Sequence, residues 1–168
     1  MVPIGRAVRH ALSTPLAARR AFSAAALQQV GAAIAAAEAT HAGEIRFAVE
    51  GALPWSYLWR DAPARQRAMM VFAKLRVWDT EQNNGVLLYL ELADRAVELV
   101  ADRGIAGKVP QARWDAICAA MQQQLRAQDP VGAVTSAVAA IGAVLAEHYP
   151  VAPGAMNPNE LPDQPVVL

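Results

Sequence analysis

Cysteine is almost absent from this sequence: Cys118 is the only one among 168 residues. An intramolecular disulfide therefore cannot form, which fits a reducing compartment. A zinc site built from several thiolates is excluded for the same reason. Because Cys118 falls within an apolar helical pattern, we expect it to pack in the core and not to act as a nucleophile, which would need a positioned base.

Net charge is absent as well, since Lys plus Arg and Asp plus Glu both number 15. A balanced chain gives no electrostatic case for a nucleic-acid partner. No acidic residue precedes Glu38, and the first 20 residues carry four arginines. The segment lacks the continuous apolar stretch of a secretory signal. We expect residues 1–21 to be a loose basic arm, with contact to an anionic membrane surface as the alternative.

Long hydrophobic runs are missing too. The longest, from Val131 to Ala146, has about 16 residues, fewer than the roughly 20 that a spanning helix needs. We expect it to be a buried helix, with no transmembrane segment. Together with the missing signal, this predicts a cytoplasmic protein, with peripheral membrane association as an alternative.

What the sequence does have is 55% apolar residues, enough for a core. Apolar spacing and capping residues predict a series of helices and strands. They are a helix from about 24 to 40, strand 44–50, a helix from about 64 to 77, strands 86–92 and 96–101, and two helices opening at Pro110 and Pro130. Residues 150–168, with several prolines, are expected to be an extended tail.

This α-β-α-β-β-α-α order predicts the architecture. The first two strands should form a right-handed parallel unit around their crossover helix. The hairpin of the second and third strands adds an antiparallel strand. The sequence therefore predicts an α/β fold over residues 22–149, a three-layer α/β/α sandwich around a small mixed sheet.

This topology brings polar residues together at one end of the sheet, where the two parallel strands start and the third ends. We name this the polar edge; its predicted members are Glu44, Asp79, Glu81, Asn83, Asn84, Asp102 and Arg103. Carboxylate and amide oxygens suit Ca²⁺ or Mg²⁺, and Arg103 could bind a phosphate with two hydrogen bonds. The alternative is structural, because Asn-Asn-Gly is ordinary turn chemistry and Asp102 could pair with Arg103.

The opposite edge is the rival site, since open α/β sheets commonly bind ligands beyond the carboxyl ends of parallel strands. Its candidates are Glu50, Trp55, Tyr57, Trp59, Asp61 and Asp94. Trp55, Tyr57 and Trp59 are candidates for a partner surface, since aromatics are common in interface cores. Alternatively, the three rings cover the edge of the sheet.

Four stretches carry a resemblance to a known family: residues 43–46, 77–88, 93–95 and 97–105. They resemble the TPM-domain family, which includes a plant thylakoid-lumen protein described as an acid phosphatase and photosystem II repair factors. The resemblance covers about residues 22–149 and implies the same sandwich. It also implies a divalent-ion site, calcium first, and a phosphatase activity. By motif position, Asp79, Asn83, Asn84 and Asp102 would bind the metal.

The sequence departs from many relatives in two respects. Where they have a Gly-Tyr-Gly segment after the third strand, this chain reads Asp102-Arg103-Gly104-Ile105. It also shows neither the signal peptide nor the membrane helix of many relatives, which would suit a cytosolic branch.

Two functions remain open from the sequence. The first is an interaction module for assembly or maintenance, with an ion-binding edge and an unidentified protein partner that could be membrane-associated. The second is a divalent-ion-dependent, acid-phosphatase-like hydrolase of phosphomonoesters. Catalytic residues are not assigned, because no nucleophile elbow, glycine-rich phosphate loop or zinc-protease helix is present.

Overall fold

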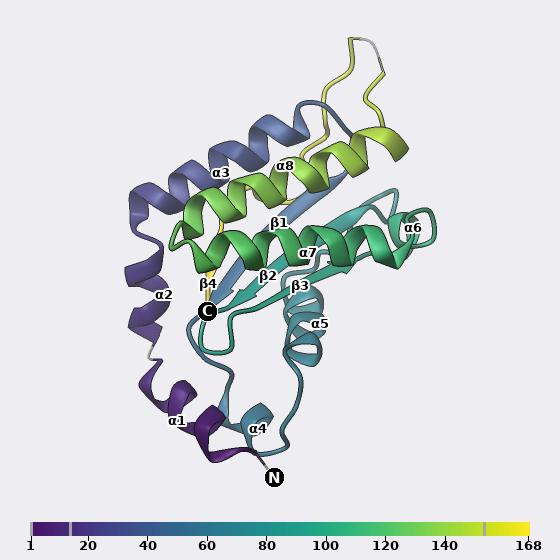
Figure 1. Ribbon diagram of the computed structural model, residues 1–168. Helices are drawn as coiled ribbons and strands as arrows, with labels where there is room; N and C mark the ends of the chain where they lie inside the picture. The colour runs from purple at the N-terminus through teal and green to yellow at the C-terminus, as the bar shows by residue number, and fades with distance from the viewer. Residues whose placement is uncertain (1, 14, 153) are drawn as a thin grey trace.

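The computed structural model describes residues 2–13, 15–152 and 154–168, which form helices on both faces of one four-stranded sheet (Figure 1). The helices are α1 Ile4–Leu12, α2 Pro15–Ala21, α3 Ala24–Glu38, α4 Trp55–Leu58, α5 Ala64–Lys74, α6 Arg103–Ala106, α7 Gln111–Arg126 and α8 Pro130–His148. The strands are β1 Glu44–Glu50, β2 Gly85–Glu91, β3 Ala96–Ala101 and β4 Val166–Val167. The predicted α/β class and mixed sheet are confirmed.

The sheet has the strand order β3-β2-β1-β4. β1 and β2 are parallel and in register from Glu44 opposite Gly85 to Glu50 opposite Glu91. β3 returns antiparallel to β2, so the predicted parallel unit and hairpin are both present. β4 was not predicted: it pairs parallel with β1 on its other side, with Ala48 opposite Val166.

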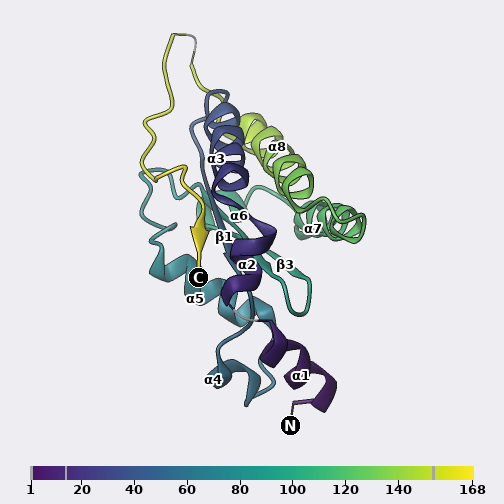
Figure 2. The same cartoon turned by 90° about the vertical axis from the view of Figure 1, so that its left-hand side faces the viewer.

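β2 is one of the two inner strands of the sheet, and its sequence shows why it is covered on both faces. Val86, Leu88 and Leu90 belong to the larger core, whereas Leu87 and Tyr89 belong to a smaller one. The larger core lies under α3, α7 and α8, and the smaller one lies under α5 and the tail (Figure 2). An apolar run without alternation thus predicted a strand buried on both faces.

α8 is long and apolar enough to cross a membrane by length and composition alone. In the fold it packs against α3 and α7, and Val134, Val138 and Ile141 are buried in the larger core. The helix begins as its sequence predicts: Pro130 takes the first turn and the Asp129 side chain accepts a hydrogen bond from Gly132 N at 2.8 Å. The apolar run is therefore a core helix of this fold.

The N-terminal residues differ from expectation, because α1 and α2 replace the loose arm predicted for residues 1–21. Ala18 of α2 and the following Phe22 lie in the larger core. α1 attaches through polar side chains, Arg6 and His10, to groups far along the chain. The partners of these side chains lie far along the chain, so the sequence did not reveal that this segment attaches to the domain.

The tail from residue 150 runs back along β1. Asn157 Nδ2 donates hydrogen bonds to the carbonyl oxygens of His41 and Gly43 at 2.7 and 3.0 Å. Leu161 is buried in the smaller core, and Leu168 N donates to Val49 O at 2.9 Å. The tail therefore covers the open side of β1 from its start to its end.

Candidate functional site

The polar edge forms where β1 and β2 begin and β3 ends. Asn84 Nδ2 donates to Ala42 O at 2.8 Å, which ties the start of β2 to the residues before β1. The buried Thr80 hydroxyl accepts from Asn84 N at 3.1 Å. On the other side, Asp102 N donates to Gly85 O at 2.8 Å. Asn84, just before β2, and Asp102, just after β3, thus lie at the same edge, as the topology predicts.

Two more predicted residues meet in the loop beside them. Asn83 has a φ of 52°, a left-handed conformation that asparagine adopts more readily than most residues. Its side-chain oxygen accepts from Arg103 Nε at 3.2 Å, and its carbonyl accepts from Gly104 N at 2.9 Å. A Cβ at Gly104 would lie 2.5 Å from the carbonyl oxygens of Gln82 and Asn83. Only glycine at 104 allows α6 to approach the loop this closely.

Two oxygen atoms of the polar edge are buried without a hydrogen-bond partner among the described residues: Asn84 Oδ1 and Asp102 Oδ2. Asp102 Oδ1 caps α6 by accepting from Arg103 N at 2.7 Å, so one carboxylate oxygen is engaged and one is not. An unpartnered buried acceptor costs about 1–3 kcal/mol. A hard cation is the kind of ligand that satisfies such oxygens.

Glu44 is at the same edge but is already engaged. Its carboxylate is buried and accepts backbone hydrogen bonds from Glu160 N and Leu161 N, both at 3.1 Å. Burial raises the pKa of Glu44, although the two N–H donors act in the opposite direction. Glu44 therefore binds the tail.

Asp79 and Glu81 lie on the exposed part of the loop. Asp79 is paired with Arg76 at 2.7 Å. Glu81 directs its backbone N–H, not its carboxylate, to Glu160 at 2.8 Å. The structure therefore brings together Asn83, Asn84, Asp102 and Arg103, and gives Glu44 and Asp79 other partners.

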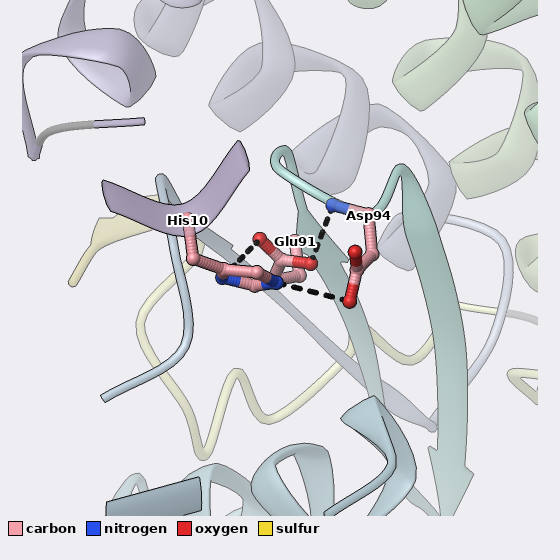
Figure 3. Close-up of side chains that lie close together, drawn as sticks. All are labelled: His10, Glu91 and Asp94. Carbon is pink, nitrogen blue, oxygen red and sulfur yellow. Dashed lines mark hydrogen bonds and ion pairs between the residues drawn. The ribbon is translucent and has the colours of Figure 1, made fainter. Parts of the chain in front are cut away.

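At the opposite edge, His10 of α1, Glu91 at the end of β2 and Asp94 in the β2–β3 turn converge (Figure 3). His10 Nε2 lies 3.0 Å from Asp94 Oδ2, and His10 Nδ1 lies 3.8 Å from Glu91 Oε1. One imidazole and two carboxylates, with ligand atoms within 4.8 Å of one another, could hold a metal ion. Sequence reasoning missed this cluster, because His10 is distant from the acids along the chain.

Most ligand atoms of the cluster already have protein partners. Glu91 accepts from Ala93 N at 2.7 Å and from Asp94 N at 2.9 Å, which closes the turn. His10 Nδ1 accepts from Leu53 N at 3.0 Å. A metal ion would have to displace these bonds, although His10 Nε2, like Asn84 Oδ1 and Asp102 Oδ2 of the polar edge, has no hydrogen-bond partner among the described residues.

Within this cluster, Asp94 attaches α1 to the rest of the domain. It accepts from Arg6 Nε at 2.7 Å and from Arg9 Nη2 at 2.9 Å, in addition to its contact with His10. Burial alone would raise the pKa of Asp94, but the hydrogen bonds from His10, Arg9 and Arg6 outweigh it and lower the pKa to about 2. Asp94 is therefore an ionised anchor that fixes α1 to the β2–β3 turn.

The remaining candidates at this edge divide into packed and exposed groups. Arg67 donates to both oxygens of Glu50 at 2.8 and 2.6 Å, and Tyr89 Oη donates to Glu50 at 2.6 Å. This buried triad leaves Glu50 without a free oxygen for a ligand. Tyr57 lies beneath the guanidinium of Arg67 at 5.7 Å from its ring centroid.

Trp55 and Trp59, in contrast, are 62% and 81% exposed. Of the three aromatic residues proposed from the sequence as a partner surface, these two present their rings to solvent, whereas Tyr57 is half-buried.

The fold and the polar edge together define a class of protein: an α/β domain with a parallel β-α-β unit, a hairpin, and amide and carboxylate groups at the strand ends. The chain belongs to the TPM domain (TPM phosphatase) family, whose sequence profile matches residues 18–144. This confirms the resemblance seen in the sequence.

A solved structure shares the fold. It is the NMR structure of the BA42 protein from the psychrophilic bacterium Bizionia argentinensis, with a TM-score of 0.74 and 27% sequence identity. The similarity covers 86% of this chain and 94% of that chain. A search of curated proteins gave no match.

Proposed function

We propose that this TPM domain is a divalent-ion-binding interaction module that assists assembly or maintenance of another protein complex. The polar edge is its binding site, and Ca²⁺ or Mg²⁺ is the ion. The proposal rests on two buried oxygens at this edge that have no hydrogen-bond partner among the described residues, Asn84 Oδ1 and Asp102 Oδ2. Asn84 is fully buried, so its oxygen cannot exchange freely with bulk water.

Asn84 and Asp102 would be the ligands at the strand ends, and Asn83 the candidate from the loop; Asp79 would join them only by leaving its ion pair with Arg76. A bound cation would supply positive charge at the surface, where a carboxylate or phosphate of a partner could bind. The protein's own part is orientation: Gly104 lets α6 pack on the loop, and Thr80 fixes the backbone of Asn84.

An alternative is hydrolysis of phosphomonoesters, and Arg103 is the observation that favours it. Its side chain is exposed, and among the described residues only its Nε has a hydrogen-bond partner. The terminal nitrogens are therefore available to bind a phosphate beside the proposed ion. Cys118 is no alternative nucleophile, because burial raises the pKa of its thiol to about 11. Hydrolysis at this edge would thus depend on an ion that activates water.

Calcium titration followed by amide NMR shifts tests ion binding. We expect saturable shifts at residues 79–85 and 101–104, and their loss in Asp102→Asn. Asp115→Asn is the matched control, because it removes an exposed carboxylate from α7. Absence of saturable shifts would contradict the proposal, and shifts confined to the His10–Glu91–Asp94 cluster would move the ion site to the other edge.

A separate assay decides the alternative. Phosphomonoester turnover should be measured with and without a chelator, in the wild type and in Arg103→Ala. If hydrolysis is the function, both the chelator and the substitution reduce turnover. If all four rates equal the buffer background, the hydrolase is rejected while ion binding stands on its own titration.

A further inference from the structure

α1 presents its apolar side to solvent. Ile4, Val8 and Leu12 are spaced by four residues, which places them on one face of the helix. They are 84%, 49% and 78% exposed. A surface helix of a globular domain normally turns such a stripe toward the core. Here the stripe is turned away from it.

The polar side of α1 is the side that contacts the domain. Arg6 and His10 lie two residues from the apolar positions, and two residues correspond to about 200° around a helix. His10 is buried, and Arg6 donates to Asp61, Asp94 and the carbonyl of Ala62. These polar contacts fix the orientation of the helix, so the outward direction of its apolar face is built into the fold.

Other exposed apolar side chains belong to the segments next to α1. α4 lies beside α1 in both views (Figures 1 and 2), and the bonds from Arg6 to Asp61 and Ala62 join the two segments. α2 adds one aliphatic side chain and α4 with its C-cap adds two indoles. We name this set the N-terminal apolar surface; it comprises Ile4, Val8, Leu12, Leu16, Trp55 and Trp59.

Exposed arginines accompany this surface on α2 and beside α4. Arg19, Arg20 and Arg60 are exposed, and no acidic residue precedes Glu38. The acids nearest to α1, Asp61 and Asp94, are each paired with an arginine of that helix. The surface is therefore apolar with a basic surround.

We propose that the N-terminal apolar surface binds the headgroup region of an anionic lipid bilayer. Aliphatic side chains on one helix face, indole rings and arginines are the combination by which interfacial helices bind such membranes. Indoles favour this boundary because their ring is apolar and their N–H is polar. A second copy of the chain fits less well, since pairing two such surfaces would bring arginines of like charge together.

Flotation with vesicles tests this proposal on the whole chain. We expect binding to vesicles of phosphatidylcholine with phosphatidylserine, weaker binding to phosphatidylcholine alone, and a decrease at high salt. Ile4→Ser/Val8→Ser/Leu12→Ser should lower the partition coefficient at least about tenfold, because three aliphatic side chains lose their burial in lipid. Trp78→Ser is the matched control: Trp78 is 47% exposed but lies beside the polar edge, and its loss should leave binding unchanged.

Tryptophan fluorescence gives a second readout. Vesicles should shift the emission to shorter wavelength in the wild type, and Trp55→Phe/Trp59→Phe should lose that shift while still floating. The proposal is overturned if the wild type does not bind anionic vesicles, or if the control reduces binding as much as the triple variant. It is also overturned if the wild type forms a dimer without lipid and the triple serine variant makes it monomeric, since the surface would then join two copies.

Discussion

At the scale of single residues, Glu38 shows how burial controls charge. It ends α3, and its Oε1 accepts from Ile45 N at 2.7 Å, while Oε2 has no partner among the described residues. Burial raises the pKa of Glu38 to about 9, helped by the nearby carboxylates of Glu44 and Asp163. Burial therefore favours the protonated form of Glu38 at neutral pH.

This protonation makes stability depend on pH. The folded-state pKa of Glu38 lies above the unfolded value of 4.5, so the folded protein holds an extra proton between the two. The stability contribution is complete below the unfolded pKa and declines as pH rises toward 9. We expect Glu38→Gln to be less sensitive to alkali than the wild type. Urea denaturation at acidic and mildly alkaline pH measures the unfolding free energy of both proteins. If it falls equally with pH in the wild type and in Glu38→Gln, the raised pKa of Glu38 is contradicted.

The buried pair of Arg67 and Glu50 makes a second residue-scale prediction. Arg67→Ala leaves the Glu50 carboxylate buried with only Tyr89 as a donor, which we expect to cost about 3–5 kcal/mol of unfolding free energy. Arg67→Met/Glu50→Leu removes both charges and should cost less than the single substitution. Chemical denaturation compares the unfolding free energies of the two variants. If the double variant is less stable than Arg67→Ala, the ion pair itself stabilises the fold.

At the scale of elements, α1 depends on Asp94 for its attachment. The folded-state pKa of Asp94, about 2, lies below its ordinary 3.8, so its contribution is present above 3.8 and is lost as pH falls toward 2. Asp94→Asn removes that charge at every pH. We expect trypsin to cleave at Arg6 or Arg9 faster in this variant, because α1 detaches more often.

The control for this experiment is Asp79→Asn, which removes an exposed carboxylate paired with Arg76 at the other edge. It should leave cleavage of α1 unchanged. Equal cleavage rates for wild type and Asp94→Asn would mean that Arg6, through Asp61 and Ala62, is sufficient to fix the helix.

Elements with local signals were predictable from the sequence. Ser23 caps α3 and Asp129 caps α8, each through a side-chain bond three residues along the chain. These N-cap residues marked where the two helices begin, so the helices could be located from the sequence. β4 and α6, with two and four residues, have too little sequence to show a period.

The same distinction applies to the candidate site. The convergence of Asn84 and Asp102 follows from strand direction, so the topology predicted it. The engagement of Glu44 by Glu160 and Leu161 depends on where the tail docks, which no local pattern indicates. Likewise, His10 meets Glu91 and Asp94 only in the folded chain.

At the scale of the whole molecule, the tail connects the two ends of the sheet. It contacts Glu44 at the polar edge and pairs with Ala48 and Val49 further along β1. Ending the chain before Asn157 should therefore expose the open side of β1 and speed amide hydrogen exchange at Val49, whose carbonyl accepts from Leu168 N. Hydrogen-exchange NMR checks this, with β3 amides as the internal control; unchanged exchange in β1 would show that α3 and α8 alone protect the strand.

The strand order also bears on how the protein is made. β1 emerges from the ribosome early, and β4, which covers its open side, follows more than a hundred residues later. Until β4 arrives, β1 presents unpaired backbone groups, which is the condition under which strands of different chains associate. We expect the interval between synthesis of these two strands to be the period in which the nascent chain depends most on chaperones.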